Sequence, residues 1–351
     1  MIACWNNPDE TVNECKRADH LAIIIPFRNE ENALPELLRQ LKQQIEQTPG
    51  ATLVLVNDHS SDASVQIAIE LTKSIPQATL LQQEQTFGKK QGVDLAMQIV
   101  QTDWVVTLDA DVRIGPNWLH RIASLTYSNI NELLILPLHI GPGSSLIGSL
   151  QEVEFASVMG VTAGMAIAGE PVLCNGGNLC FRRAAYERVK PQRKDMHIPS
   201  GDDLFLLHAL KPGGKIKWVH DPHTRVYTQP LHSWKALTAQ RLRWMGKTGS
   251  MRDPWLQRTA WLTFLTNASL LIGMAAVATG YVAPAIILLA WGMKVLLDGW
   301  LIVKVGRWLC IKRLKRFYFL LIFLYPFYAT LFPLMSQFIR PSWKGRKTTI
   351  R

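Results

Sequence analysis

HLAIIIPFRNE, residues 20–30, is a continuous apolar run that ends in Pro26 and a polar cluster. Four to eight apolar residues bounded by a chain breaker are typical of a strand that is buried on both faces. The stretch ATLVLVNDHSSD, residues 51–62, repeats the pattern and again ends in polar residues. Residues 31–47 lie between the two runs and carry leucines at helical spacing, which indicates the order strand, helix, strand.

The alternation continues toward the middle of the chain. The pattern predicts a helix over residues 63–74, a strand over 78–82, a helix over 89–100 and a strand over 104–108. Strands that alternate with helices favour a mostly parallel sheet with helices on both faces. The predicted fold class is therefore α/β, of the Rossmann-like kind.

Ligands of such sheets bind at the carboxyl ends of the strands. Three predicted strands end in polar clusters, which are Arg28-Asn29-Glu30, Asn57-Asp58-His59 and Asp109-Ala110-Asp111. A binding site is expected where these ends converge. The residues that follow the first predicted strand lack the glycine-rich G-x-G-x-x-G fingerprint. This absence excludes a dinucleotide-dependent dehydrogenase.

The third cluster lies in TLDADVRI, residues 107–114. Residues i and i+2 of a strand point to the same side, so the carboxylates of Asp109 and Asp111 can converge on one cation. Mg²⁺ and Mn²⁺ prefer oxygen ligands, often one or two carboxylates together with substrate phosphates. The pair therefore predicts a divalent metal that holds a diphosphate, although two solvated acids at a turn are the simpler explanation.

The C-terminal part of the chain is apolar and basic. Three apolar segments, Trp261 to Thr279, Val282 to Val303 and Phe317 to Phe338, are each about long enough to span a bilayer. Residues 299–351 contain eleven Lys or Arg and no acid, so the net charge of +11 belongs to this region. Basic residues beside apolar segments favour a membrane surface over nucleic acid as the partner.

The prolines Pro326 and Pro333 leave open whether the third segment spans the membrane or re-enters it. The five cysteines have no metal-binding spacing, and the polar N-terminus has no apolar signal-peptide core. A membrane protein with several spans is expected, with its soluble part in the cytoplasm, as in a bacterial inner membrane.

Six motifs follow one another over about 220 residues. They are Pro26-Phe27-Arg28-Asn29-Glu30, Asn57 to Asp62, Gly88-Lys89-Lys90-Gln91-Gly92-Val93-Asp94, Asp109-Ala110-Asp111, Asp202-Asp203 and Gln240-Arg241-Leu242-Arg243-Trp244. In this order the chain resembles the membrane-attached family 2 glycosyltransferases of the GT-A fold, which include cellulose, chitin, hyaluronan and ceramide glucosyl transferases. Asn57, Gly92 and Asp94 depart from the family pattern and leave the base contacts and the choice of donor open.

The resemblance implies that a nucleotide diphosphate sugar, with UDP as the expected nucleotide, is the donor. The implied donor contacts are Pro26, Arg28, Glu30, Asp58, Lys89, Asp109, Gln240, Arg243 and Trp244, and Asp109 and Asp111 are the implied ligands of Mg²⁺ or Mn²⁺. Simpler roles stay open for some of them. Glu30 can offset a helix dipole, and Trp244 can anchor an amphipathic helix, residues 235–247, at the membrane interface.

The same resemblance makes Asp203 the general base that deprotonates an acceptor hydroxyl, with Asp202 beside it as the second catalytic acid. Both acids also suit the first turn of the helix that follows them, where they would cap it and offset its dipole. The implied acceptor contacts are Asn175, Gly176, Gly177, Asn178 and Trp244. A glycine-rich turn before a helix that begins near Arg183 would explain the first four equally well.

Four regions are predicted: a cytosolic GT-A domain over residues 1–230, an amphipathic interfacial segment over 231–258, a membrane region over 259–340 and a basic tail over 341–351. The predicted protein is an inverting, metal-dependent hexosyl or N-acetylhexosaminyl transferase that uses a lipid, lipid-linked or glycan acceptor at the membrane. A processive polysaccharide synthase subunit and a non-catalytic, membrane-anchored nucleotide-sugar binder are the alternatives. No nucleic-acid partner is expected.

Overall fold

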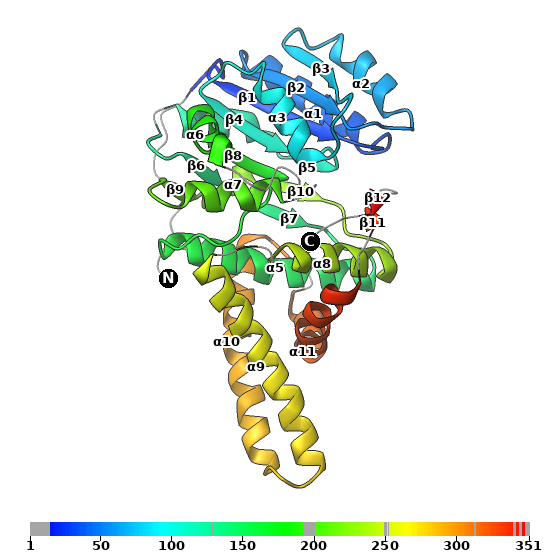
Figure 1. The fold of residues 1–351 in the computed structure, drawn as a ribbon, viewed down its shortest axis with the longest axis vertical. Helices are drawn as coiled ribbons and strands as arrows, with labels where there is room; N and C mark the ends of the chain where they lie inside the picture. Colours follow the sequence, from blue (N-terminus) through cyan, green and yellow to red (C-terminus); the bar gives the residue numbers. More distant parts are fainter. Residues whose placement is uncertain are drawn as a thin grey trace. The chain divides into compact units, whose positions relative to one another are not determined.

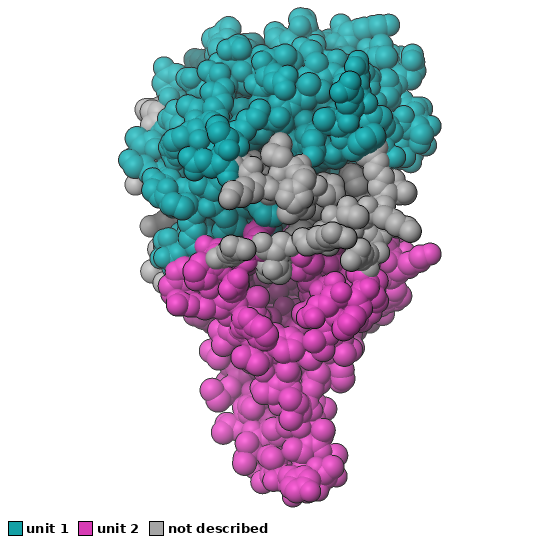
Figure 2. All heavy atoms as spheres, in the orientation of Figure 1, with its two compact units in different colours: residues 1–139, 162–229 teal, residues 140–161, 230–351 magenta. Residues whose placement is uncertain are grey.

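The computed structural model describes residues 15–127, 129–192, 201–248, 251, 253–311, 314–339, 342–343 and 346–347. The polar N-terminus and most of the predicted basic tail lie outside these residues. The chain forms two compact units, one of residues 1–139 and 162–229 and one of residues 140–161 and 230–351, which Figure 2 colours separately. The sequence predicted one continuous domain over 1–230, whereas the structure assigns residues 140–161 to the second unit.

The first unit alternates strands and helices in the predicted order (Figure 1). Its elements are β1 (Leu21–Phe27), α1 (Leu34–Gln47), β2 (Thr52–Asn57), α2 (Ser64–Thr72), β3 (Ala78–Gln82), α3 (Lys89–Met97), β4 (Trp104–Leu108), β5 (Val112–Ile114), α4 (Trp118–Thr126), β6 (Leu133–Ile135), β7 (Leu138–Ile140), β8 (Asn178–Arg182), α6 (Arg183–Val189), η2 (Lys190–Gln192), α7 (Asp202–Leu210), β9 (Ile216–Trp218), η3 (Pro222–Thr224) and β10 (Val226–Thr228).

Seven of these strands form one sheet in the order β3-β2-β1-β4-β8-β6-β9. All neighbouring strands are parallel except those that flank β8, which runs antiparallel to both β4 and β6. Every residue of β1 is buried, and successive side chains of a strand point to opposite faces, so both faces of the sheet are covered at β1. This mostly parallel sheet confirms the predicted α/β fold class.

Residues 132–140 contain two short strands, because Leu136 and Pro137 separate β6 in the large sheet from β7 in a three-stranded sheet of order β5-β10-β7. Proline has no N–H to donate to a strand ladder, which ends the pairing there. The alternative of a glycine-rich turn before a helix near Arg183 holds in part: α6 begins at Arg183, but β8 lies between the turn and this helix and enters the sheet between β4 and β6.

The second unit is built of helices. Its elements are α5 (Leu146–Ile167), whose last residues belong to the first unit, α8 (Trp234–Thr248), α9 (Pro254–Ala278), α10 (Pro284–Trp308), α11 (Leu314–Phe338) and the short strands β11 (Ser342–Trp343) and β12 (Arg346–Lys347). Within α5, a Cβ on Gly160 would lie 3.1 Å from Leu301 and Val305 of α10. This close packing of α5 against α10 explains why residues 140–161 group with the C-terminal helices.

The apolar helices α9, α10 and α11 are long and apolar enough to cross a membrane, on length and composition. Asp253 accepts a hydrogen bond from the Leu256 N–H at 2.8 Å and Pro254 follows it, which is a common start for a helix. Helices α9 and α10 run side by side in Figure 1, and α11 contacts both. Within α10, Lys294 Nζ lies 2.5 Å from Asp298 Oδ2, four residues further along the helix.

Candidate active site

Lys89, the first residue of α3, joins three parts of the first unit. Its Nζ donates to Asp109 Oδ1 at 2.6 Å and to the Gly176 carbonyl at 2.7 Å, and it lies 3.9 Å from Asp202 Oδ2. Asp109 follows the end of β4, Gly176 belongs to the turn before β8, and Asp202 opens α7. One ammonium group therefore holds the end of a central strand, a loop and a helix start together.

The charge state of Lys89 follows from its neighbours. Burial lowers the pKa of the Lys89 ammonium, but the nearby carboxylates Asp109, Asp202 and Asp203 outweigh that effect and raise the pKa above its ordinary value. Lys89 is consequently a permanent cation at any physiological pH. A permanent cation in this position keeps acids close together that would otherwise repel one another.

Asp203 is held by backbone groups. Its Oδ2 accepts from the Gly176 N–H at 2.9 Å, and its Oδ1 accepts from the Leu204 N–H at 2.8 Å. The turn at Gly176-Gly177 thus touches both Lys89 and Asp203, because the Gly176 carbonyl accepts from Lys89 and the Gly176 N–H donates to Asp203. The buried Cys174 nearby has a pKa raised well above that of an ordinary thiol, chiefly by burial and also by Asp203 and Asp202. Cys174 is therefore a neutral thiol, which excludes it as a nucleophile.

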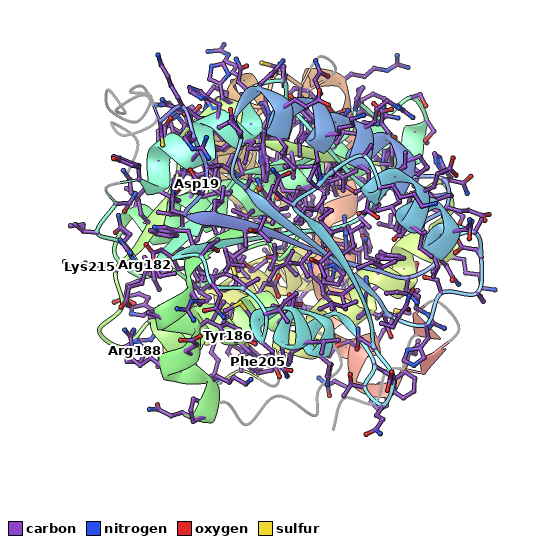
Figure 3. All side chains as sticks on the ribbon, turned by 90° about the horizontal axis from the view of Figure 1, so that it is seen from above. Asp19, Arg182, Tyr186, Arg188, Phe205 and Lys215 are labelled. Atoms are coloured by element: carbon purple, nitrogen blue, oxygen red, sulfur yellow. The ribbon has the colours of Figure 1, made fainter. Side chains whose placement is uncertain are left out.

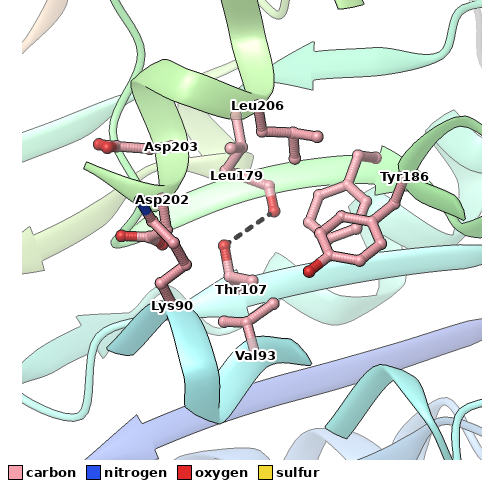
Figure 4. A pocket seen from close by; sticks show the side chains of 9 residues that line it. Lys90, Val93, Thr107, Leu179, Tyr186, Asp202, Asp203 and Leu206 are labelled. Carbon is pink, nitrogen blue, oxygen red and sulfur yellow. Dashed lines mark hydrogen bonds between the residues drawn. The ribbon is translucent and has the colours of Figure 1, made fainter. Parts of the chain in front are cut away.

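A small pocket lies beside the two acids of α7. Lys90 and Val93 of α3 and Thr107 of β4 line it opposite Asp202 and Asp203 (Figure 4). The Lys90 side chain is 1% exposed, and its Nζ lies 4.5 Å from the ring centre of Phe205. Thr107 donates to the Gly176 carbonyl at 3.1 Å and to the Leu179 carbonyl at 3.4 Å, and so ties β4 to the turn and to β8.

Asp109 and Asp111 are the candidate ligands for a divalent metal. The Asp109 side chain is 44% exposed, and Asp111 is exposed with its Oδ2 3.4 Å from the Thr228 hydroxyl. Gly177 allows the close approach, because a Cβ there would lie 2.5 Å from Asp109 Oδ2. No group of three or more His, Cys, Asp or Glu in the described part of the chain forms a complete metal site. Two carboxylates fit a hard cation that takes its remaining ligands from a diphosphate.

The loops after β1 and β2 build a second part of the site. Arg28 Nη1 donates to the carbonyls of Asp58 at 2.7 Å and His59 at 2.8 Å, which fixes the two loops to each other. The carboxylate of Asp58 is buried, and its Oδ1 lies 3.3 Å from Nδ1 of His59. The His59 ring stacks on Phe87 with 4.4 Å between centroids, and Phe87 is half exposed. An aromatic face beside a carboxylate suits a nucleoside.

Comparison with known proteins decides the family. Residues 22–187 match the family model described as glycosyl transferase family 2, and this range contains β1 to β4, Lys89, Asp109 and the Gly176 turn. These residues form a family 2 glycosyltransferase domain.

Two curated sequences illustrate the relatives of the family 2 domain. An undecaprenyl-phosphate 4-deoxy-4-formamido-L-arabinose transferase from Sodalis glossinidius is 34% identical over 113 residues, which are 31% of this chain and 34% of that protein. A dolichyl-phosphate beta-glucosyltransferase from Trichomonas vaginalis is 32% identical over 98 residues, 26% of this chain and 30% of that protein. The chain thus spans about a third of the length of the curated relatives it matches.

A solved structure confirms the fold. The mannosyltransferase PcManGT from Pyrobaculum calidifontis, in complex with GDP-Man and Mn²⁺, superposes with a TM-score of 0.61 over 87% of this chain and 91% of that one. The sequence identity of 17% makes this a likeness of fold. With the mostly parallel sheet described above, it confirms the predicted GT-A fold of the family 2 domain and the α-helical C-terminal region.

The structure locates the remaining predicted residues of the family 2 domain. Pro26 is buried inside β1, and Glu30 is half-buried, with its backbone N–H donating to the Ser64 hydroxyl at 2.7 Å. Asn175 is half-buried beside the Gly176 turn. Asn178 is 0% exposed, and its Nδ2 donates to the carbonyls of Pro137 and Thr224. Asn178 therefore braces three chain segments, and we leave it out of the proposed acceptor contacts.

Gln240, Arg243 and Trp244 belong to α8 in the second unit, outside the matched range of the family 2 domain. All three are half-buried. Arg241 lies among them and is 2% exposed, with its guanidinium carbon 4.3 Å from the Trp244 ring centre. The sequence pattern singled out the three residues around Arg241 and passed over Arg241 itself.

Three other residues near the predicted site were not chosen from sequence. Lys90 lines the pocket beside the acids of α7, Phe87 stacks on His59, and the Thr228 hydroxyl lies 3.4 Å from Asp111 Oδ2. A second lysine after Lys89 and an aromatic residue before Gly88 were visible signals for two of them. Nothing in the sequence connects Thr228 with Asp111, because β5 and β10 meet only through the small sheet.

Proposed function

We propose that the protein is an inverting, metal-dependent glycosyltransferase that moves a sugar from a nucleotide diphosphate sugar to a lipid acceptor at the membrane. One observation carries the proposal, which is the acid cluster at the end of β4 and the start of α7: Asp109, Asp202 and Asp203 gather around Lys89, and Asp111 follows Asp109 by two residues. The Asp109 side chain is 44% exposed and Asp111 is exposed, so solvent reaches both carboxylates. Accessible carboxylates suit a divalent cation that takes its other ligands from a diphosphate.

Each group of the cluster has a distinct proposed task. Asp109 and Asp111 would hold Mg²⁺ or Mn²⁺, and the cation would neutralise charge that builds on the leaving diphosphate. Lys89 orients the Asp109 carboxylate through its hydrogen bond. It would also supply a positive charge near the diphosphate in addition to that of the metal. Arg28, Asp58 and the His59–Phe87 stack would bind the nucleoside, with UDP as the expected nucleotide.

The acceptor is proposed from the relatives and from the C-terminal helices. Both relatives described above carry a lipid phosphate in their names, and α9, α10 and α11 are apolar enough to enter a membrane. The acceptor oxygen is either a lipid phosphate, which these names favour, or a lipid hydroxyl. A hydroxyl requires a base such as Asp203, whereas a phosphate monoester, with a second pKa of about 6, is already an anion at neutral pH.

The first experiment uses the full chain, purified in detergent, with a panel of labelled nucleotide sugars and either undecaprenyl phosphate or a hydroxyl-bearing glycolipid. Label is expected in the lipid fraction when Mg²⁺ or Mn²⁺ is present and not after chelation of the metal. Binding of a donor without transfer to any acceptor would favour the non-catalytic binder. If no donor binds and none is turned over, the proposal is wrong.

The second experiment separates the two acceptor chemistries. With a hydroxyl acceptor, Asp203→Asn is expected to lower kcat by roughly 100- to 10,000-fold, because the base is lost. With a phosphate acceptor, the same variant retains most of its activity, and the wild-type rate rises with pH to about 7 and then levels as the phosphate ionises. Asn at this position still offers an oxygen to the Gly176 N–H, so the turn is preserved.

A further inference from the structure

Arg241 forms a buried ion pair inside the second unit. Its Nη2 donates to Glu154 Oε2 of α5 at 2.6 Å, and its Nη1 donates to the side-chain oxygen of Gln240 at 2.6 Å. The guanidinium also lies over the Trp244 ring, 4.3 Å from its centre. One side chain therefore touches two of the three residues that the Q-x-x-R-W pattern marks, and it anchors them to a different helix.

The pair is well removed from solvent. Arg241 is 2% exposed and Glu154 is 8% exposed. A buried ion pair is a poor source of net stability, because the cost of desolvating two charges offsets most of their attraction. Its geometry is nevertheless strict, since a planar guanidinium directs its N–H groups in fixed directions. We therefore expect such a pair to orient the neighbouring side chains and to add little to stability.

Further contacts extend the pair on both sides. The Tyr328 hydroxyl of α11 donates to Glu154 Oε1 at 3.4 Å. The residue after Glu154 is Phe155, whose ring centre lies 6.1 Å from that of Trp244. Trp244 is thus held between Phe155 of α5 and Arg241 of its own helix, and Glu154 links that arrangement to the third apolar helix.

We propose that Arg241 is a positioning residue, which through its pair with Glu154 fixes Gln240 and Trp244 in the geometry needed for sugar transfer. The proposal rests on the proposed glycosyltransferase function and on the family resemblance, which implies that Gln240 and Trp244 contact the donor. It assigns a role to a position that the Q-x-x-R-W pattern leaves variable and to an acid of α5 that lies outside every motif of the sequence.

The decisive variant is the double replacement Glu154→Met/Arg241→Met. Apolar side chains of similar length remove both charges together, and such replacements of buried pairs commonly preserve or increase stability. The double variant is expected to keep the wild-type Tm in detergent. Its kcat/KM for transfer is expected to fall about 100-fold, the loss typical of catalytic groups displaced by about 1 Å. A purely structural pair would leave kcat/KM unchanged in this variant.

A second measurement reports on Trp244 without requiring activity. The chain contains 12 tryptophans, so 5-fluorotryptophan labelling gives 12 resonances in ¹⁹F NMR, and the loss of one in Trp244→Phe assigns Trp244. In Glu154→Met/Arg241→Met the Trp244 resonance is expected to shift and narrow as the ring loses its neighbour. Arg241→Lys, which keeps the charge without the planar fork, is expected to give an intermediate shift and an intermediate kcat/KM.

Arg188→Met is the matched control, because Arg188 donates to both oxygens of Glu132 at 2.6 and 2.8 Å on an exposed surface of the first unit. It should change neither the Trp244 resonance nor kcat/KM. An unchanged Trp244 resonance in Glu154→Met/Arg241→Met would overturn the inference, and so would unchanged kcat/KM. If the double variant does not fold, Arg241→Lys decides by the same two criteria. Absence of transfer by the wild type would refute the proposed function alone, because the ¹⁹F result still tests the role of Arg241.

Discussion

The acid cluster and the Arg241–Glu154 pair both join a cation to carboxylates, but they differ in exposure. In the first unit, Lys89 approaches Asp109 and Asp202, and the Asp109 side chain remains 44% exposed. In the second unit, one guanidinium faces one carboxylate, and both are buried. Water can still reach Asp109 in the cluster, whereas the pair is closed to water.

This difference distinguishes a group of charges that could bind a ligand from one that holds two helices together. Partly exposed carboxylates let a metal ion or another ligand approach. A matched, buried pair resists movement, because separating it would leave a charge without solvent. Exposure, more than residue type, is therefore the feature that we expect to distinguish the charges that bind substrate. The following four changes test that distinction.

Removing both candidate metal ligands should have the largest effect. In Asp109→Asn/Asp111→Asn, transfer is expected to fall at least about 1,000-fold because the proposed metal is no longer held. The measurement is transfer at saturating Mn²⁺, with Asp19→Asn as the control at an exposed acid that is paired with Arg17 (Figure 3). Metal-dependent transfer by the double variant would show that the metal, if used, binds elsewhere.

Removing the cation of the cluster should have the next largest effect. Lys89→Met is expected to cost about 1.5–3 kcal/mol, the usual contribution of hydrogen bonds to a charged group. Since the folded-state pKa of Lys89 is raised, its contribution is complete below the unfolded pKa of about 10.4 and is lost only as the pH rises through the higher folded value. Thermal melts in chelator should give a Tm difference that is constant from pH 6 to 9 and shrinks above pH 11. A difference that shrinks near neutral pH would contradict this assignment.

A smaller change tests the space around Asp109. Gly177→Ala places a Cβ 2.5 Å from Asp109 Oδ2, so the carboxylate must move. The affinity for Mn²⁺, measured by calorimetry with the nucleotide diphosphate present, is expected to weaken about 10-fold, or about 1.4 kcal/mol. Gly115→Ala is the control, because a Cβ there meets nothing within 4 Å. Equal effects of the two substitutions would argue against a constraint at Asp109.

The smallest effect is expected where a pair is exposed. Arg188 lies at the edge of the first unit (Figure 3), and its side chain is 53% exposed beside Glu132. Arg188→Met should lower stability by less than about 1 kcal/mol, because solvent and salt screen such pairs. The difference in Tm between Arg188→Met and the wild type should also change little when salt is added. A loss as large as that of Lys89→Met would mean that exposure does not decide the value of these pairs.

Much of the fold followed from pattern alone. The apolar runs at β1 and β2 and the leucine spacing of α1 were sufficient to predict strand, helix, strand in the correct order, because burial imposes these periodicities. The insertion of β8 was not predictable, since Asn178–Arg182 has no strand-like alternation. Its place depends on β4 and β6, which lie far away in the chain.

Some residues of the candidate site could be predicted from the sequence, and others could not. Asp109, Asp202 and Asp203 could be chosen from sequence, because acids at strand ends and helix starts are visible as local patterns. Asn178 was chosen for its polarity, yet the tertiary structure buries it as a brace between Pro137 and Thr224. Arg241 and Glu154 are 87 residues apart, and no local pattern relates them.

The sequence by itself determined the α/β order of elements and the three apolar helices, and it singled out the candidate acids, because each depends on short-range periodicity or on local residue type. Only the tertiary structure decided which acids share a cation, which polar side chains are buried and which arginine braces the Q-x-x-R-W segment. Those outcomes depend on charge balance and exposure, which arise only when distant segments pack together.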